Sequence, residues 1–473
     1  MDPDLISMEE TASYTDTVVN YDPPTSRAST LTTVYPFRWV ILALYSLTAF
    51  ANTLMWLSLF TITDATCAFY NVNETVFLWS SNAFTFLQVI AAFPISFAPS
   101  RFGLRPTMVV ATAINAIGAC IMIAGAQENG FVFFVLGQCV ISISACILPQ
   151  LAPEVAAVWF GEHERATATS IGIIMGNLGA AIGFLQPALL MKDVDLKNDM
   201  DVMEDRLEEL IYSQASLCIL MLFFVVLLFR DQPLKPPSLS QLQRHGPGAI
   251  SFTDFKNSVK QLLTNRDYHF SGNAYALASA LLIVVPVTLN QIVAWRIPNE
   301  DTTVGWMGFT GVLIGLLGSI LFGLVLDKTQ AFKALAFLLS FASSLFWLGF
   351  SSSLIQWQNI VAAFTFFVIS LFVFIPFGPV VVDMISEITY PISSSTAYVI
   401  PITLGRIYSI VFIFLVGWLI QTNRQNVVCY LVASVIGLCS LLTLITRVDR
   451  KRAKVEGTIE DTYSGSFDNE SFS

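Results

Sequence analysis

Long apolar segments alternate with short polar ones along almost the whole chain. Twelve segments are apolar and long enough to cross a membrane, since a spanning helix needs about 20 mostly apolar residues. They cover residues 37–63, 76–98, 106–125, 131–158, 166–191, 210–229, 270–295, 304–326, 332–352, 357–381, 396–420 and 426–446. Prolines interrupt the fourth and tenth segments, where we expect kinks. The pattern predicts an all-α polytopic membrane protein with twelve transmembrane helices.

The polar segment 230–269 divides these helices into six plus six. We predict a disordered cytoplasmic N-terminal tail (1–36), an N-terminal six-helix bundle (37–229), a cytoplasmic linker (230–269), a C-terminal six-helix bundle (270–446) and a cytoplasmic C-terminal tail (447–473). The two halves are also similar in sequence pattern, because a short charged loop follows both the second and the eighth helix. Two six-helix repeats resemble the major facilitator fold, in which substrate binds near the midplane between the halves.

Composition supports a membrane protein. Of 473 residues, 55% are hydrophobic and 12% are charged, whereas a soluble domain carries about 25% charged residues. The net charge of −10 comes mainly from the two tails and the acid-rich loop 192–209, so we expect the lipid bilayer as partner and no nucleic acid. The three histidines are dispersed, and the cysteines fall mainly inside apolar segments. We therefore expect no disulfide framework, no metal site and no cofactor.

The basic residues predict the orientation in the membrane. Of the 24 lysines and arginines, 18 fall on the side that carries both termini. Cytoplasmic loops are enriched in these residues, so both termini are expected to be cytoplasmic. The plasma membrane is the default location, with an endolysosomal membrane as the alternative. We expect a monomer.

Arg406 is the most informative single residue. It lies about ten residues from either end of the apolar segment 396–420, where a charge costs roughly 2.5–3.5 kcal/mol on insertion scales. Three roles stay open: contact with substrate, a structural role on aromatic faces and backbone carbonyls, or a gating ion pair with Glu154. No Asp or Glu lies at similar depth in another apolar segment, which favours a uniporter or exchanger over a proton symporter.

Several motifs carry a family resemblance. Gly323–Asp327, followed by Lys328 and Lys333, resembles the loop signature of major facilitator transporters. Further stretches resemble the FLVCR-like transporters of solute carrier family 49: Arg38-Trp39, Val158–Gly161, Glu164–Ala168, Met175–Phe184, Leu289–Gln291, Gly315–Asp327 and Glu387–Pro391. The likeness runs from about residue 37 to 446 and implies a twelve-helix carrier. It assigns Asp327 and Arg165 to the cytoplasmic gate. Ser100 stands where the first-half copy of the loop has Asp in the family.

The resemblance also implies a substrate site. Members of the family are associated with choline and ethanolamine, or with haem and vitamin-like substrates, and the choline-type site combines an aromatic cage with two glutamines. Trp56 and Tyr275 match the cage, whereas Asn177 and Arg406 stand where the family has its glutamines. Gln291 is a further candidate. A fixed positive charge opposes a cation, so Arg406 favours an anionic or zwitterionic substrate.

The sequence as a whole predicts a secondary transporter that works by alternating access as a facilitator. Choline, ethanolamine or haem transport is one alternative. Another is a membrane receptor or sensor that keeps the fold without net transport, for which Ser100 is the support. We expect no enzyme activity, because no nucleophile–base or metal constellation is apparent.

Overall fold

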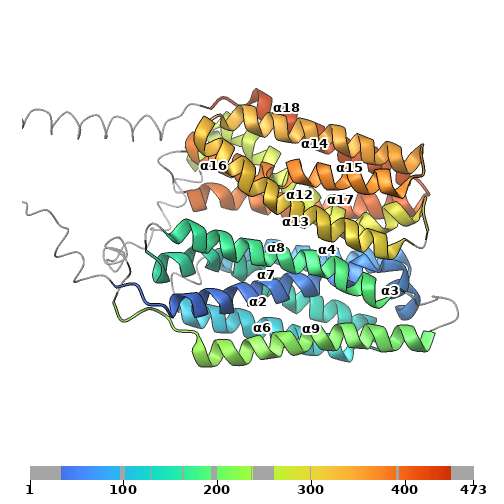
Figure 1. The fold of residues 1–473 in the computed structure, drawn as a ribbon, viewed down its shortest axis with the longest axis horizontal. Coiled ribbons are helices and arrows are strands. Elements are labelled where there is room, and N and C mark those ends of the chain that lie inside the picture. Colours follow the sequence, from blue (N-terminus) through green and yellow to red (C-terminus); the bar gives the residue numbers. More distant parts are fainter. Residues whose placement is uncertain are drawn as a thin grey trace, which may run out of the picture.

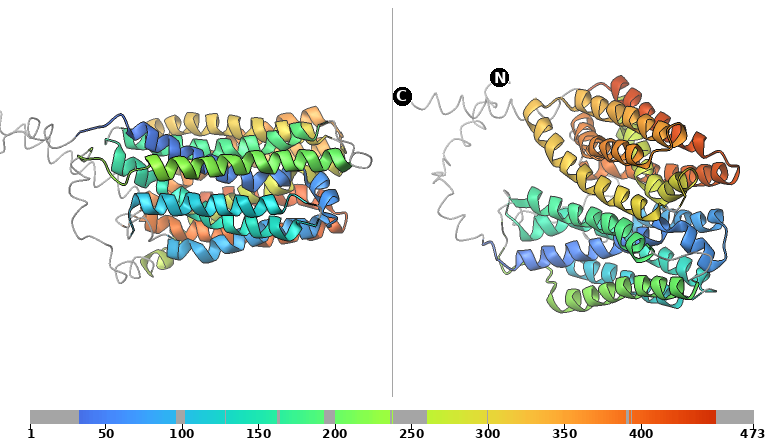
Figure 2. Two further views of the ribbon diagram at one scale, coloured as in Figure 1. Left: turned by 90° about the horizontal axis from the view of Figure 1, so that it is seen from below. Right: turned by 45° about the vertical axis from the view of Figure 1, so that its right-hand side comes forward.

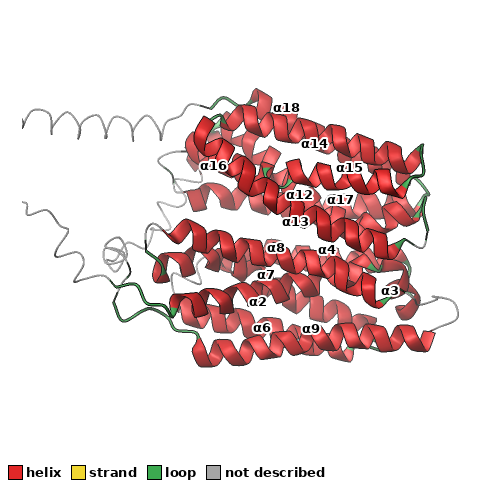
Figure 3. Cartoon of the chain, in the orientation of Figure 1, coloured by secondary structure: helices red, strands yellow, loops and turns green. Residues whose placement is uncertain are grey.

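The computed structural model describes residues 33–95, 102–127, 129–161, 164–192, 200–235, 237, 260–298, 300–389, 392 and 394–448. Within these ranges the secondary structure is helical, with no strand (Figure 3). Twelve spans are long and apolar enough to cross a membrane, which confirms the predicted fold class.

The helices form two groups along the chain (Figure 1). The first group contains α2 (Arg38–Thr61), the short α3 (Thr63–Tyr70), α4 (Glu74–Ile95), α6 (Leu104–Ala124), α7 (Phe131–Trp159), α8 (Arg165–Leu190) and α9 (Met200–Leu228). The second contains α12 (Arg266–Ala294), α13 (Asp301–Thr329), α14 (Phe332–Ile355), α15 (Ile360–Phe374), α16 (Phe377–Thr389), α17 (Ser394–Gln421) and α18 (Gln425–Ile445).

The bundle has two ends, which we call terminal and distal. At the terminal end α2 begins and α18 ends; α3 lies at the distal end. The two groups of helices meet along α4–α17, α8–α13 and α2–α12. Several of their side-chain contacts lie toward the distal end, such as Trp79 edge-on to Phe414, with ring centroids 5.8 Å apart, and Thr302 Oγ1 donating to Ala188 O over 3.4 Å. The ribbons diverge toward the terminal end (Figure 2). This conformation is therefore closed at its distal end.

Glycines allow the closest helix crossings. A Cβ on Gly179 of α8 would lie 2.2 Å from the carbonyl oxygen of Phe50 on α2. A Cβ on Gly308 of α13 would lie 2.2 Å from the Phe184 ring on α8. Without a hydrophobic driving force between helices in lipid, such small residues let backbones approach and gain dispersion energy.

The structure corrects two local expectations and confirms a third. The sixth span begins at Met200 rather than at 210, because the acid-rich segment continues the helix instead of forming a loop. The kink expected in the tenth segment is confirmed, because that span divides into α15 and α16 where Pro376 has no N–H to continue the hydrogen-bond ladder. Asp327 lies in the last turn of α13, which ends where Gln330 adopts a left-handed φ of 50° and donates its N–H to Leu326 O over 2.7 Å.

The loop between α4 and α6 receives an acid from elsewhere in the chain. Ser100, the residue that departs from the family pattern, lies outside the described residues. Asp231, just beyond α9, accepts the backbone N–H of Arg105 over 2.8 Å at the start of α6. Gly103 has a φ of 90°, and a Cβ there would lie 3.1 Å from the same Asp231 oxygen. Asp231 thus supplies a carboxylate to the loop in which the sequence lacks one.

Candidate functional site

Arg406 lies near the middle of α17, twelve residues after Ser394 and fifteen before Gln421. The residue is half-buried. Its positive charge acts on three side chains: Cys146 of α7, Tyr275 of α12 and Tyr398 of α17. In the part of the chain that the structure describes, Arg406 forms no ion pair with a carboxylate. A charge at mid-span thus faces a sulfur and two phenols rather than a counter-ion.

The two tyrosines form one unit. The Tyr275 and Tyr398 hydroxyls are hydrogen-bonded to each other, and their rings meet edge to face with centroids 5.0 Å apart. The pair exists because α12 and α17 run side by side. Tyr268 Oη donates to Ala397 O over 2.7 Å, and a Cβ on Gly405 would lie 2.0 Å from Ser279 Oγ. The close crossing at Gly405 places the adjacent Arg406 beside α12.

A second aromatic pair lies in the first group of helices. Trp56 of α2 stacks on Phe84 of α4, with ring centroids 5.7 Å apart and an angle of 21° between planes. The Trp56 Nε1 atom is buried and has no hydrogen-bond partner among the described residues. Buried indole N–H groups usually find a partner, so this donor is available to a bound molecule.

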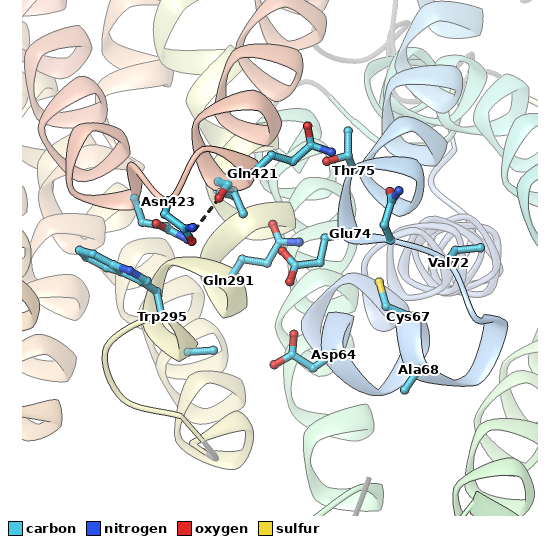
Figure 4. Close-up of a pocket in the computed structure, with 14 residues that line it drawn as sticks. Asp64, Cys67, Ala68, Val72, Glu74, Thr75, Gln291, Trp295, Gln421 and Asn423 are labelled. Atoms are coloured by element: carbon cyan, nitrogen blue, oxygen red, sulfur yellow. Dashed lines mark hydrogen bonds between the residues drawn. The ribbon is translucent and has the colours of Figure 1, made fainter. Parts of the chain in front are cut away.

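The other predicted substrate residues are more dispersed. Asn177 lies mid-way along α8, between Gly176 and Gly179, and no described contact joins it to Arg406 or Tyr275. Gln291 lies sixteen residues after Tyr275 on α12, which is about 24 Å along the helix axis. It lines a distal pocket instead (Figure 4). A small solute cannot touch Gln291 and Tyr275 together in this conformation.

The predicted gating residues lie toward the terminal end. Arg165 is the first residue of α8, Glu154 lies five residues before the end of α7, and Asp327 is in the last turn of α13. The side chain of Asp327 lies outside the described residues. Glu154 is eight residues beyond Cys146, about 12 Å along α7, and its direct pairing with Arg406 stays a prediction.

Sequence reasoning missed Tyr398, Phe84 and Cys146. Tyr398 precedes Arg406 by eight residues on one helix, a spacing that keeps two side chains on the same face, so this spacing could have indicated it. Cys146 lies beside α4, where its Sγ donates to Gln88 O over 3.5 Å, and nothing in the sequence signals that crossing. Among the described residues, no three His, Cys, Asp or Glu side chains gather as a metal site would require.

Comparisons with known proteins agree with this arrangement. The sequence model of the Major Facilitator Superfamily matches residues 40–398. The choline/ethanolamine transporter flvcr2a of Danio rerio is 30% identical over 89% of this chain and 89% of its own. Its relative flvcr2b of the same organism is 31% identical over 68% of this chain and 65% of its own. The choline/ethanolamine transporter FLVCR1 of Felis catus is 28% identical over 90% of this chain and 78% of its own.

Solved structures support the fold. The inward-open xylose transporter XylE of E. coli superimposes with a TM-score of 0.69 at 13% identity, covering 88% of this chain and 99% of XylE. At that identity the likeness concerns architecture alone. The sequence match over residues 40–398, the identity to flvcr2a and the twelve-span fold together identify the family. The chain belongs to the Major Facilitator Superfamily and is an FLVCR-like secondary transporter.

Proposed function

We propose that this transporter carries a small organic solute with a negatively charged group, an anion or a zwitterion, between its two groups of helices. The observation that carries the proposal is Arg406, a mid-span charge without a carboxylate partner among the described residues. Burying a charge in the membrane is costly unless a ligand, water or a protein group offsets the cost. A substrate carboxylate or phosphate would do so, because the planar guanidinium binds such groups with two parallel hydrogen bonds.

The groups around the proposed site are mainly hydrogen-bond donors. Arg406 has five N–H donors and no acceptor, and the buried Trp56 N–H has no described partner. Asn177 would add a hydrogen bond after the two groups of helices shift against each other. Donors directed at one solute favour an acceptor-rich group on it, which a carboxylate or phosphate provides.

The aromatic pairs suit the remainder of the solute. The faces of Trp56 and Tyr275 can hold apolar carbon or an ammonium group, the latter by cation–π attraction of roughly 0.5–2 kcal/mol per contact. The relatives named above are choline/ethanolamine transporters. An ammonium group against the aromatic faces and an anionic group on Arg406 describe a zwitterion, such as an amino acid or a phosphorylated amino alcohol.

The transport cycle follows from the fold. The conformation closed at the distal end would alternate with one closed at the terminal end, where we assign the gate to Arg165, Glu154 and Asp327. The excess of basic residues supports a cytoplasmic terminal end. We propose that the protein works as a monomeric facilitator in the plasma membrane.

Ligand-induced stabilisation of purified protein tests the proposal. Wild type, Arg406→Gln and the charge-keeping Arg406→Lys are melted with choline, ethanolamine, amino acids, phosphorylated amino alcohols, small carboxylates and phosphates. A ligand at 100 times its Kd adds about 2.7 kcal/mol, and we expect stabilisation that depends on Arg406 only for solutes with an anionic group. Arg406→Gln should lose the effect, and Arg406→Lys should keep part of it.

Two outcomes would contradict the proposal. If choline stabilises wild type and Arg406→Gln equally while anions do nothing, the arginine is structural and the relatives' substrate applies. Uptake of the stabilising solute into proteoliposomes tests whether the protein transports the solute that it binds. Stabilisation without any flux would indicate a receptor that keeps the fold.

A further inference from the structure

A pocket of about 650 Å³ lies at the distal end, where the two groups of helices meet. Residues of α3 and α4 form one side, and residues of α12, α17 and α18 form the other (Figure 4). It is separate from the site around Arg406, since Gln291 on its wall lies about 24 Å along α12 from Tyr275. The proposed substrate site around Arg406 does not include this pocket.

Two carboxylates face the pocket without a cation. Asp64 of α3 and Glu74 of α4 both line it and repel each other electrostatically. The carboxylate of Asp301, at the start of α13, is also repelled by that of Asp64. In the described part of the chain, neither pocket carboxylate forms an ion pair. Burial raises the pKa of Asp64, because loss of solvent disfavours the charged carboxylate.

Basic residues near the pocket form no ion pair with its carboxylates in the described part of the chain. The Arg296 guanidinium lies 4.0 Å from the centroid of the Trp295 ring. Arg424 occupies the N-cap position of α18. Neither is paired with Asp64 or Glu74 among the described residues. The local charge inside the pocket is therefore negative.

Buried amides add unsatisfied acceptors. Gln291 is 5% exposed, and neither its Oε1 nor its Nε2 has a hydrogen-bond partner among the described residues. Its side chain points into the pocket beside Glu74, with the Asp64 carboxylate nearby (Figure 4). Gln425 is 6% exposed, and its Oε1 likewise lacks a described partner. Such groups are rare in folded proteins because an unpaired buried polar atom is costly.

We propose that this distal pocket binds the primary ammonium group of a small organic cation. The pocket presents two carboxylates and two amide oxygens, which together require a positive charge that also donates hydrogen bonds. A primary ammonium has three N–H donors, whereas a quaternary ammonium has none. The volume of about 650 Å³ holds an organic molecule, because a water occupies only about 30 Å³. The Gln291 N–H remains for an acceptor atom elsewhere on that molecule.

Binding there would act on the conformational equilibrium. Asp64 and Glu74 come from one group of helices, and Gln291 and Gln425 from the other. A ligand that contacts both sides stabilises the distal-closed conformation, because those contacts are lost when the sides separate. An ammonium compound on the distal side thus regulates the carrier. This inference does not depend on the substrate assigned to Arg406.

Thermal unfolding of the full-length purified protein tests the site with simple probes. Methylammonium chloride is compared with tetramethylammonium chloride and sodium chloride at equal ionic strength. We expect a saturable rise in Tm with methylammonium and none with the other two salts. Asp64→Asn and Gln291→Leu should each weaken the apparent affinity at least tenfold. Gln421→Leu, at an exposed glutamine on the same pocket wall, is the matched control and should bind as wild type does.

Several results would overturn this site. Equal shifts with all three salts would show an ionic-strength effect, and unchanged binding in both Asp64→Asn and Gln291→Leu would place the ligand elsewhere. If Gln291→Leu fails to fold, Gln291→Asn takes its place, with the same tenfold criterion. Arg406→Gln separates the two proposals, because it should keep the methylammonium response even if the anion response is lost or was never present.

Discussion

Gly179 offers a sharp test of the packing that positions the proposed site. A Cβ at this position would lie 2.2 Å from Phe50 O, 2.9 Å from Phe50 C and 3.0 Å from Phe50 Cα. All three atoms are backbone, so no side chain can rotate away. Ordinary contact begins near 3.4 Å, and α2 and α8 would have to separate by about an ångström. Gly179→Ala is therefore expected to destabilise the protein.

The magnitude follows from two opposing terms. Overpacking of a tight interior typically costs about 1–3 kcal/mol. Replacing glycine by alanine within a helix stabilises the helix by up to about 1 kcal/mol. For domains of 150–250 residues, 1 kcal/mol corresponds to roughly 2–4 °C in Tm, so we expect Tm to fall by several degrees. Thermal unfolding of the detergent-purified protein, followed by tryptophan fluorescence, measures this change.

Gly176 provides the control on the same helix. A Cβ there meets only the Ala49 side chain at 4.0 Å, so Gly176→Ala should leave Tm unchanged or raise it slightly. Similar melting temperatures for Gly179→Ala and Gly176→Ala would refute the close α2–α8 crossing.

Two further predictions concern the polar groups. Tyr398→Phe removes the hydroxyl that holds Tyr275 and should raise the KM of transport several-fold with little change in Tm, as measured by uptake into proteoliposomes; an unchanged KM would contradict a role for the pair. Because burial raises the pKa of Asp64, the folded state binds its proton more tightly than the unfolded state does. Stability should therefore increase as pH falls through the raised pKa and be lost as pH rises through it. Asp64→Asn should have a higher Tm than wild type at pH 8, and the difference should shrink as the pH is lowered through the raised pKa; a difference that stays constant across the acidic range would contradict this argument.

Hydropathy predicted the fold because the bilayer imposes one requirement on every span. Each segment must satisfy its backbone internally over about 20 residues, so apolar length alone located all twelve helices. The ends of the spans were harder to predict. Residues 200–209 are rich in charged side chains, which are unfavourable inside the membrane. They are nevertheless helical, because Glu and Arg favour helix formation outside it.

The candidate site was only partly visible in the sequence. Arg406 stood out because a charge at mid-span is rare, and Trp56 and Tyr275 stood out through the family resemblance. Tyr398 became evident once α12 and α17 were seen to cross at Gly405. The distal pocket joins residues from α3, α4, α12, α17 and α18, and this proximity depends on how the two groups of helices meet. Neither periodicity nor motif spacing contains that information.

The contact between Gly103 and Asp231 ties two distant parts of the chain to each other. The two positions are 128 residues apart, yet a Cβ at the first would lie 3.1 Å from the carboxylate oxygen that accepts the Arg105 N–H. Gly103 also has a φ of 90°, which glycine adopts without strain. A side chain at 103 would therefore strain the start of α6 and crowd the acid that the loop receives, so the tolerance of position 103 to substitution depends on the residue at position 231.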